Sequence, residues 1–221
     1  MKSLNATRVN ASTFGVLSGL AGMEHGFFET LQGSVATAGL VIEAIGPAHR
    51  FWPLGTEIAF SVLPNYLLSG LLSMAFGLAI IIWSGLFIKK RYGALILAVL
   101  TVLLFLSGGG FAPAGSAIVA VIAAANINRS HSWWGHYLPE VIQRFLASTW
   151  KAALIAVVVL YLFCLWSAIF GWPLTRLFDA MTVNNTLLLL GQCALGLMFY
   201  LIPAGFAYEL QSAGEQRLAR P

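Results

Sequence analysis

The chain has 221 residues, of which 59% are hydrophobic and only 9% are charged. Soluble domains carry about 25% charged residues, so this composition excludes an ordinary soluble globular protein. The 12 basic and 8 acidic residues give a formal charge of +4, and no basic cluster exceeds the run Lys89 to Arg91. The basic excess is therefore interpreted as a signal of membrane topology, and we expect no nucleic-acid partner.

Six apolar segments are predicted as membrane spans, because a span needs roughly 20 apolar residues to cross about 30 Å of hydrocarbon. They are approximately 13–32, 58–88, 92–107, 111–127, 150–170 and 185–206. We therefore predict one all-α, polytopic transmembrane domain over residues 1–221.

The first span contains three ionisable side chains, Glu24, His25 and Glu29. A helical projection at 100° per residue places His25 and Glu29 on one glycine-rich face, within reach of each other, while Glu24 points away among leucines. A carboxylate in the middle of the bilayer is unfavourable by at least ~2.5 kcal/mol, so we expect this helix to be central rather than peripheral. The glycine face offers a surface for a homo-oligomer, because GxxxG pairs let another helix approach closely. Its residues are Gly15, Gly19, Gly22 and Gly26.

A cleaved signal peptide is the alternative interpretation of the N-terminus. Lys2 and Arg8 supply a charged start, and Ala36-Thr37-Ala38 resembles a cleavage site. The apolar core of that signal would contain all three ionisable side chains. We therefore expect the segment to be retained as a membrane span.

The outer connection 33–57 has an apolar centre, 40–45, around Glu43. At about 10–12 residues it is too short for a span, so we predict a re-entrant or surface-lying helix that forms a hydrophobic outer lid. Glu43, His49 and Glu57 are candidates for a polar outer face.

A proline interrupts the second predicted span, and a run of glycines separates the third from the fourth. The second is about 46 Å long as a helix, and Pro64 within it predicts a kink. Asn65 then lies near the outer boundary. A continuous helix over 92–127 would be about 54 Å long, so the run Gly108 to Gly110 is interpreted as a tight turn between two spans.

The inner segment 131–148 is predicted to be an amphipathic interfacial helix leading into the fifth span. Trp134, Leu138, Val141, Ile142 and Phe145 recur there at helical spacing. His131 and His136 are five residues apart and do not share a helical face, so a metal site is not expected from them.

The distribution of basic residues predicts the orientation. With six spans and an inside N-terminus, ten of the 12 basic residues lie on the inner side, and only Arg50 and Arg176 lie outside. The positive-inside rule therefore predicts cytoplasmic N- and C-termini in a multi-pass protein of the cell (inner or plasma) membrane.

Intramembrane ionisable residues are candidates for function, although they can also serve only helix packing. Because His25 has an unperturbed pKa of about 6.5, the favoured hypothesis is a small transporter or permease with a proton-titratable site. The candidates for the substrate and proton site are Glu24, His25, Glu29, Asn65 and Gln192. An intramembrane enzyme acting on a lipid-like substrate and a non-catalytic partner or assembly subunit are the alternatives. No HExxH, GxSxG or P-loop pattern occurs, and we expect no cofactor and no metal.

Overall fold

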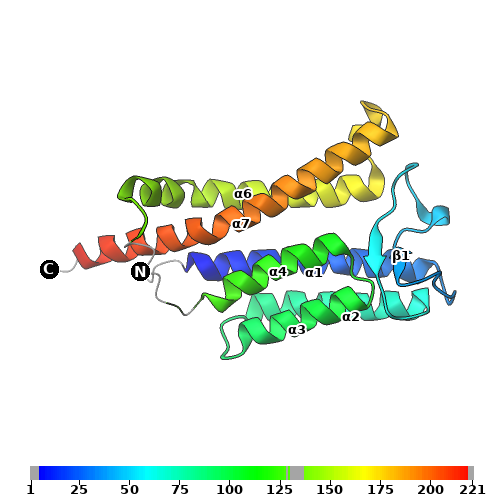
Figure 1. The fold of residues 1–221 in the computed structure, drawn as a ribbon, viewed down its shortest axis with the longest axis horizontal. Helices are drawn as coiled ribbons and strands as arrows, with labels where there is room; N and C mark the ends of the chain where they lie inside the picture. The colour runs from blue at the N-terminus through cyan, green and yellow to red at the C-terminus, as the bar shows by residue number, and fades with distance from the viewer. Residues whose placement is uncertain (1–4, 128, 130–136, 219–221) are drawn as a thin grey trace.

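The computed structural model describes residues 5–127, 129 and 137–218, and its dominant elements are six α-helices that run along the long axis of the molecule (Figure 1). The helices are α1 (Ala6–Leu31), α2 (Tyr66–Ile82), α3 (Gly93–Leu106), α4 (Phe111–Ala125), α6 (Glu140–Phe170) and α7 (Ala180–Leu218). The short elements are the strands β1 (Val41–Glu43) and β2 (Ile58–Phe60), the 3-10 turns η1 (Pro47–His49) and η3 (Leu174–Arg176), and the π-helical turn η2 (Trp83–Phe87). The predicted all-helical class is thus confirmed.

Three helical stretches in the described part of the chain are long and apolar enough to cross a membrane. They are Tyr66–Phe87, Glu140–Phe170 and Ala180–Gly214. The helices α3 and α4 are also apolar, but they have only 14 and 15 residues. At 1.5 Å per residue they are about 21–23 Å long, which is less than the roughly 30 Å of a hydrocarbon core.

Two helices begin earlier in the structure than the sequence predicts. The first helix begins at Ala6 rather than near residue 13, because the Asn5 side chain caps it by accepting a hydrogen bond from the Arg8 amide at 2.6 Å. The fifth begins at Glu140 rather than near residue 150, so residues 140–148 of the expected interfacial helix belong to α6. Residues 130–136, with Trp134, His131 and His136, lie outside the described residues.

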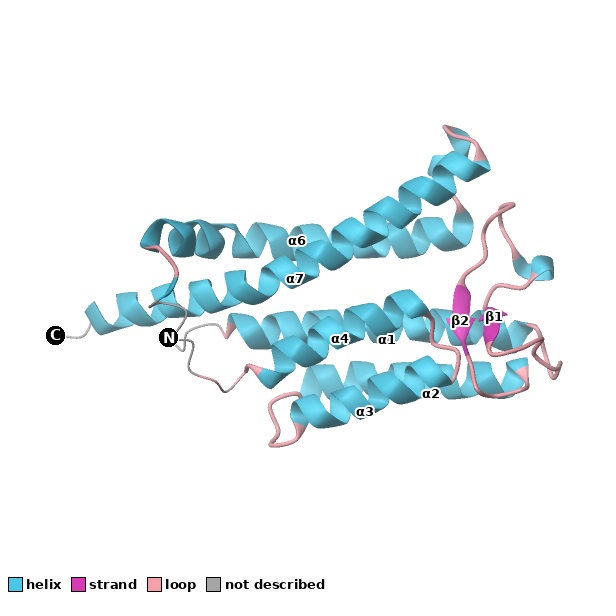
Figure 2. Ribbon diagram, in the orientation of Figure 1, coloured by secondary structure: helices cyan, strands magenta, loops and turns pink. Residues whose placement is uncertain are grey.

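The prediction of a helix in the outer connection is wrong at residues 41–43, which form β1 and pair antiparallel with β2 (Figure 2). Exposure alternates along β1, with Ile42 buried and its two neighbours exposed. This two-residue period suits a strand, and Ile42 lies opposite the buried Ala59. The following Pro47 begins only the single turn η1.

The predicted kink at Pro64 is also wrong, because this proline lies before α2 rather than inside it. Asn65 is the N-cap of α2, and its side chain accepts a hydrogen bond from the Leu68 amide at 3.1 Å. The predicted second span therefore consists of the strand β2, a short connection and then α2. The irregularity of this helix lies instead at its other end, in the π-helical turn η2.

The helix α1 is central, as predicted, because it packs against α2, α4, α6 and α7. Glycines permit the closest approach: a Cβ built on Gly19 would collide with the carbonyl oxygen of Gly77, and one on Gly26 would collide with that of Gly70. The glycine face is thus covered within the chain, by α2 at these positions and by Ser84 and Leu104 at Gly15 and Gly22. A homo-oligomer through this face stays a prediction.

The pair α6–α7 lies beside the group formed by α1, α2, α3 and α4 (Figure 1). Near the chain termini, the buried Asn10 of α1 joins the two groups. Its amide nitrogen donates to the Leu201 carbonyl at 2.6 Å, and its oxygen accepts from the Trp150 indole at 3.0 Å. Toward the hairpin end, the space between the two groups is occupied by the cavity described below.

Candidate functional site

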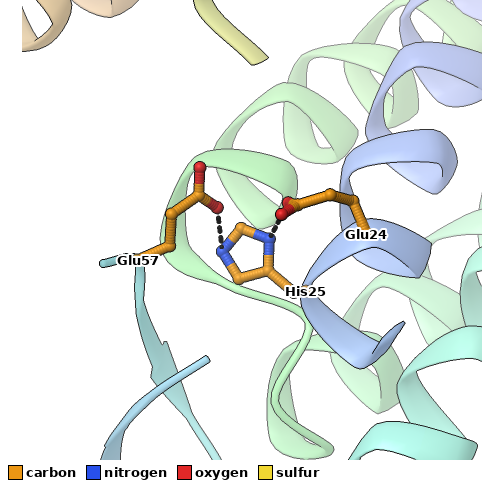
Figure 3. A group of neighbouring side chains, drawn as sticks. All are labelled: Glu24, His25 and Glu57. Carbon is orange, nitrogen blue, oxygen red and sulfur yellow. Dashed lines mark ion pairs between the residues drawn. The ribbon is translucent and has the colours of Figure 1, made fainter. Parts of the chain in front are cut away.

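The imidazole of His25 lies between two carboxylates (Figure 3). Its Nε2 is 2.8 Å from Oε2 of Glu57, and its Nδ1 is 3.1 Å from Oε2 of Glu24. The Nδ1 atom is also 3.0 Å from the Ala21 carbonyl oxygen, one helical turn earlier. The His25 side chain is only 4% exposed, so this cluster, Glu24–His25–Glu57, is shielded from bulk solvent.

Two distant parts of the chain build this cluster. Glu24 and His25 belong to α1, whereas Glu57 lies directly before β2. Backbone pairing positions Glu57, because its carbonyl accepts a hydrogen bond from the Ala44 amide at 2.7 Å. The preceding loop is anchored on α6 by the Trp52 indole, which donates to the Ala168 carbonyl at 2.8 Å. The hairpin therefore carries a carboxylate to the histidine of α1.

The glycine run between α3 and α4 contacts two of the predicted ionisable residues. A Cβ on Gly110 would collide with the His25 ring, and one on Gly108 would collide with the carboxylate of Glu29. Both glycines have positive φ, 81° and 103°. The tight turn predicted from sequence thus also lets the backbone approach His25 and Glu29 closely.

Glu57 is the acidic member of the cluster that lies outside the helices. Burial by itself would raise the pKa of its carboxyl group, but the charge of His25 and hydrogen bonds from His25 and Glu24 outweigh burial and lower the pKa. Glu57 is therefore ionised and paired with His25 at neutral pH. A charged pair inside the molecule can take up or release a proton in response to a neighbouring ligand.

The cluster borders a cavity of about 660 Å³ enclosed by α1, α4, α6, α7 and the hairpin loop. Most of its lining is apolar, with Phe111, Leu165, Leu188 and Met198 among the large side chains. The polar side chains are few and come from several elements. They are His25, Thr56, Glu57, Ser116, Tyr161, Cys164, Asn184 and Gln192. Such a volume, mostly apolar with a few polar groups, is typical of small-molecule sites.

Glu24, His25 and Glu57 are also residue types that bind metals, and one donor atom from each lies within 4.8 Å of the others. A metal ion needs several donor atoms that converge on one point. Here each ring nitrogen faces a different carboxylate, so the two nitrogens and their carboxylates do not point at one common position (Figure 3). The arrangement suits a hydrogen-bonded chain for protons better than a metal centre.

The structure brings together only part of the predicted site. Glu24 and His25 meet, although the projection separated them, because the flexible Glu24 side chain extends toward its neighbour. The ion pairs that His25 makes are with Glu24 and Glu57 rather than with the expected Glu29. Gln192 lines the cavity.

The other candidates lie in different surroundings. Asn65 caps α2 and donates to Ser34 at 3.1 Å, which is a structural role. Glu43 pairs with Arg50 at 2.6 Å, and its side chain is 49% exposed. His49 lies in η1 and is not among the residues that line the cavity. Glu29 is fully buried in a separate group of serines.

Sequence reasoning missed five polar members of the cavity. Two of them, Tyr161 and Ser116, have hydroxyl groups that are 3.2 Å apart. Tyr161 lies in the fifth predicted span and Ser116 in the fourth. Single hydroxyl residues in apolar spans are common, so no local signal marked them. Glu57 was expected only on the outer face, because nothing in the sequence pairs it with His25.

In comparisons with known proteins, no family model, no curated protein and no solved structure matches this chain.

Proposed function

We propose that this protein is a small proton-coupled permease of the cell membrane, with a cavity for an amphipathic molecule that has an apolar body and a neutral or cationic head. The observation that carries this proposal is the placement of the Glu24–His25–Glu57 cluster at the wall of the cavity. A substrate head that reaches the cluster would compete with a proton for the carboxylates. This competition is the basis of proton-coupled exchange.

The charge of the lining supports a cationic or neutral head. Among the described residues, no lysine or arginine lines the cavity, whereas Glu57 does, with Glu24 beside it. Two carboxylates and one imidazole carry a net charge of −1 when all three are ionised. An anionic head would be repelled in this low-dielectric surrounding, where Coulomb interactions are strong.

The proposed topology has six spans and cytoplasmic termini. The two chain ends lie at the opposite end of the long axis from the hairpin (Figure 1). Arg8 and the basic run Lys89 to Arg91 belong to the end that would be cytoplasmic, and Arg50 belongs to the hairpin end. The short helices α3 and α4 would span with local thinning of the bilayer or with help from their neighbours.

The test is transport in liposomes that contain the purified protein and a trapped pH-sensitive dye. Tetraphenylphosphonium and tetraphenylborate are matched probes, because they have similar size and apolar surface but opposite charge. An imposed proton gradient should drive movement of the phosphonium through the wild type, and the dye should report the coupled proton flux. The borate should produce no protein-dependent flux.

The matched variants are Glu57→Gln and Glu43→Gln. Glu57→Gln should lower coupled flux at least about tenfold, because it removes the carboxylate that pairs with His25. Glu43→Gln should retain flux, because Glu43 pairs with Arg50 away from the cavity. Equal flux in wild type and Glu57→Gln, or flux of both probe ions alike, would contradict the proposal.

An intramembrane enzyme acting on a lipid-like molecule is the second candidate. It is favoured by the His25–Glu57 pair, which has the geometry of a histidine general base held by a carboxylate and borders a mostly apolar cavity. Incubation with total membrane lipids, followed by mass spectrometry, separates the two candidates. An enzyme would consume one lipid species and form another, whereas a permease would leave the lipid composition unchanged.

A further inference from the structure

We propose that Glu29 and the serines around it form a buried site for a small monovalent cation, Na⁺. The oxygen donors are the Glu29 carboxylate and the hydroxyl groups of Ser61, Ser69 and Ser73. This site is separate from the cavity, whose lining includes none of these residues. It does not depend on the proposed transport function.

The carboxylate of Glu29 lacks the hydrogen bonds that such burial demands. The residue is 0% exposed, and within the described chain neither carboxylate oxygen accepts a hydrogen bond of ordinary geometry. A buried charge without compensation is strongly unfavourable, so the group must either hold a proton or lie beside a bound cation. The histidine on the same helix face, His25, forms its ion pairs with Glu24 and Glu57 instead.

The neighbouring Ser69 hydroxyl has one proton and several acceptors within reach. Ser69 lies beside the carboxylate, since a Cβ on Gly108 would collide with both Glu29 oxygens and with the Ser69 hydroxyl. Its other acceptors are Ser61 Oγ, 2.8 Å away, and the Ser107 carbonyl, 2.6 Å away. When the proton is donated to the Ser107 carbonyl, Ser69 presents lone pairs toward a cation next to Glu29.

The serine cluster is compact and fully enclosed. Ser73 donates to the same Ser107 carbonyl at 2.7 Å, so Ser69 and Ser73, one helical turn apart on α2, converge on one oxygen atom. Ser61 follows β2 and forms an isolated β-bridge with Ser107. All four serines are at most 3% exposed. Ser61 therefore adds a hydroxyl oxygen to the buried serine group that Ser69 brings beside Glu29.

The end of α3 adds negative potential. Ser107 is the C-cap of α3, and the last carbonyl groups of a helix carry a partial negative charge. The chain then turns through Gly108 to Gly110 before α4 begins. Interrupted helices whose C-terminal carbonyls coordinate Na⁺ or protons recur in membrane transporters. One carboxylate with neutral oxygens has a net charge of −1, which matches a monovalent ion and would leave a divalent ion undercompensated.

The experiment measures thermal unfolding of the purified full-length protein in detergent, in NaCl or choline chloride at equal ionic strength. A cation that binds the folded state raises the unfolding midpoint in a saturable manner. We expect this rise for the wild type in NaCl and its loss in Glu29→Gln and Ser73→Ala. The matched control Glu57→Gln should retain the response to Na⁺, because Glu57 belongs to the other cluster.

Equilibrium binding of radioactive ²²Na⁺ gives a second readout. Wild type should bind it saturably, with about one ion per chain, and Ser73→Ala should bind at least about tenfold more weakly. This variant also decides the outcome if Glu29→Gln does not fold. Identical unfolding in NaCl and choline chloride without saturable ²²Na⁺ binding would overturn the proposal and show that Glu29 is neutralised by a proton. A full response in Ser73→Ala would overturn it as well.

Discussion

At the residue scale, the position of His25 depends on groups that have no fixed relation in the sequence. Glu24 is its immediate neighbour on α1, Glu57 comes from the hairpin, and Gly110 supports the ring from the turn between α3 and α4. Helical projection treats side chains as rigid vectors, so it separated Glu24 from His25. A long side chain at a buried site extends toward the nearest opposite charge, and this attraction outweighs the direction of its Cα–Cβ bond.

The lowered pKa of Glu57 predicts a specific dependence of stability on pH. A group whose pKa is lower in the folded state stabilises the fold above its ordinary pKa of 4.5, and this contribution is lost as the pH falls through the lowered value. The unfolding midpoint of Glu57→Gln should lie below that of wild type by a constant amount at pH about 5–7, because a buried charged partner is lost at a cost of roughly 1–3 kcal/mol.

The difference between the two proteins should then shrink as the pH falls below about 4.5, because Glu57 of the unfolded chain takes up a proton there while Glu57 of the folded chain is still ionised. Unfolding scans from pH 7 to pH 3 measure both midpoints. A difference that stays constant down to pH 3 would contradict a lowered pKa.

A second prediction at this scale concerns Gly110→Ala. Gly110 has φ 81° and ψ 157°, a region that is almost exclusive to glycine, and an added Cβ would also collide with the His25 ring. The variant should lose about 1–3 kcal/mol of stability from backbone strain alone. The measurement is the unfolding midpoint. Gly196→Ala is the control, since nothing lies within 4 Å of a Cβ there, and it should be neutral or slightly stabilising.

At the element scale, two kinds of contact hold the helices together. Glycines bring α1 and α2 into backbone contact, while the buried Asn10 joins α1 to α6 and α7. The GxxxG pattern correctly predicted a close helix contact, but a pattern on one helix does not specify the partner. The partner proved to be α2 of the same chain, and a homo-oligomer through this face stays a prediction.

Asn10→Ala should weaken the attachment of the α6–α7 pair. It leaves the Trp150 indole N–H without its acceptor and removes the hydrogen bond to the Leu201 carbonyl, at a cost of roughly 1–3 kcal/mol. Limited proteolysis and the unfolding midpoint should both report the loss. Asn126→Ala is the matched control, because within the described residues the Asn126 side chain donates to the Ile122 carbonyl of its own helix. Equal effects of both variants would contradict this role for Asn10.

At the scale of the whole molecule, the arrangement of the described helices places the hairpin at one end and the chain termini at the other (Figure 1). The predicted six-span topology requires the turn that contains Lys90 to lie in the cytoplasm and the α6–α7 connection that contains Leu177 to lie outside. Both side chains are exposed, so each position can report its side of the membrane.

Single cysteines at these positions test the topology. In a background with Cys164→Ser and Cys193→Ser, Leu177→Cys should react with a membrane-impermeant maleimide added to intact cells. Lys90→Cys should react at least about tenfold faster in opened cells than in intact cells. Equal labelling of both cysteines in intact cells would place them on one side and contradict six spans.

The sequence by itself determined the all-helical class, the apolar helices, the glycine turn and the involvement of α1, because hydropathy, helical period and residue type are local properties. It also named Glu24, His25 and Glu57, though in separate groups. Only the tertiary structure decided that Glu57 pairs with His25, that Glu29 lies apart among serines, and that the connection 33–57 contains strands. These outcomes depend on contacts between residues far apart in the chain, where burial and charge pairing outweigh local preference.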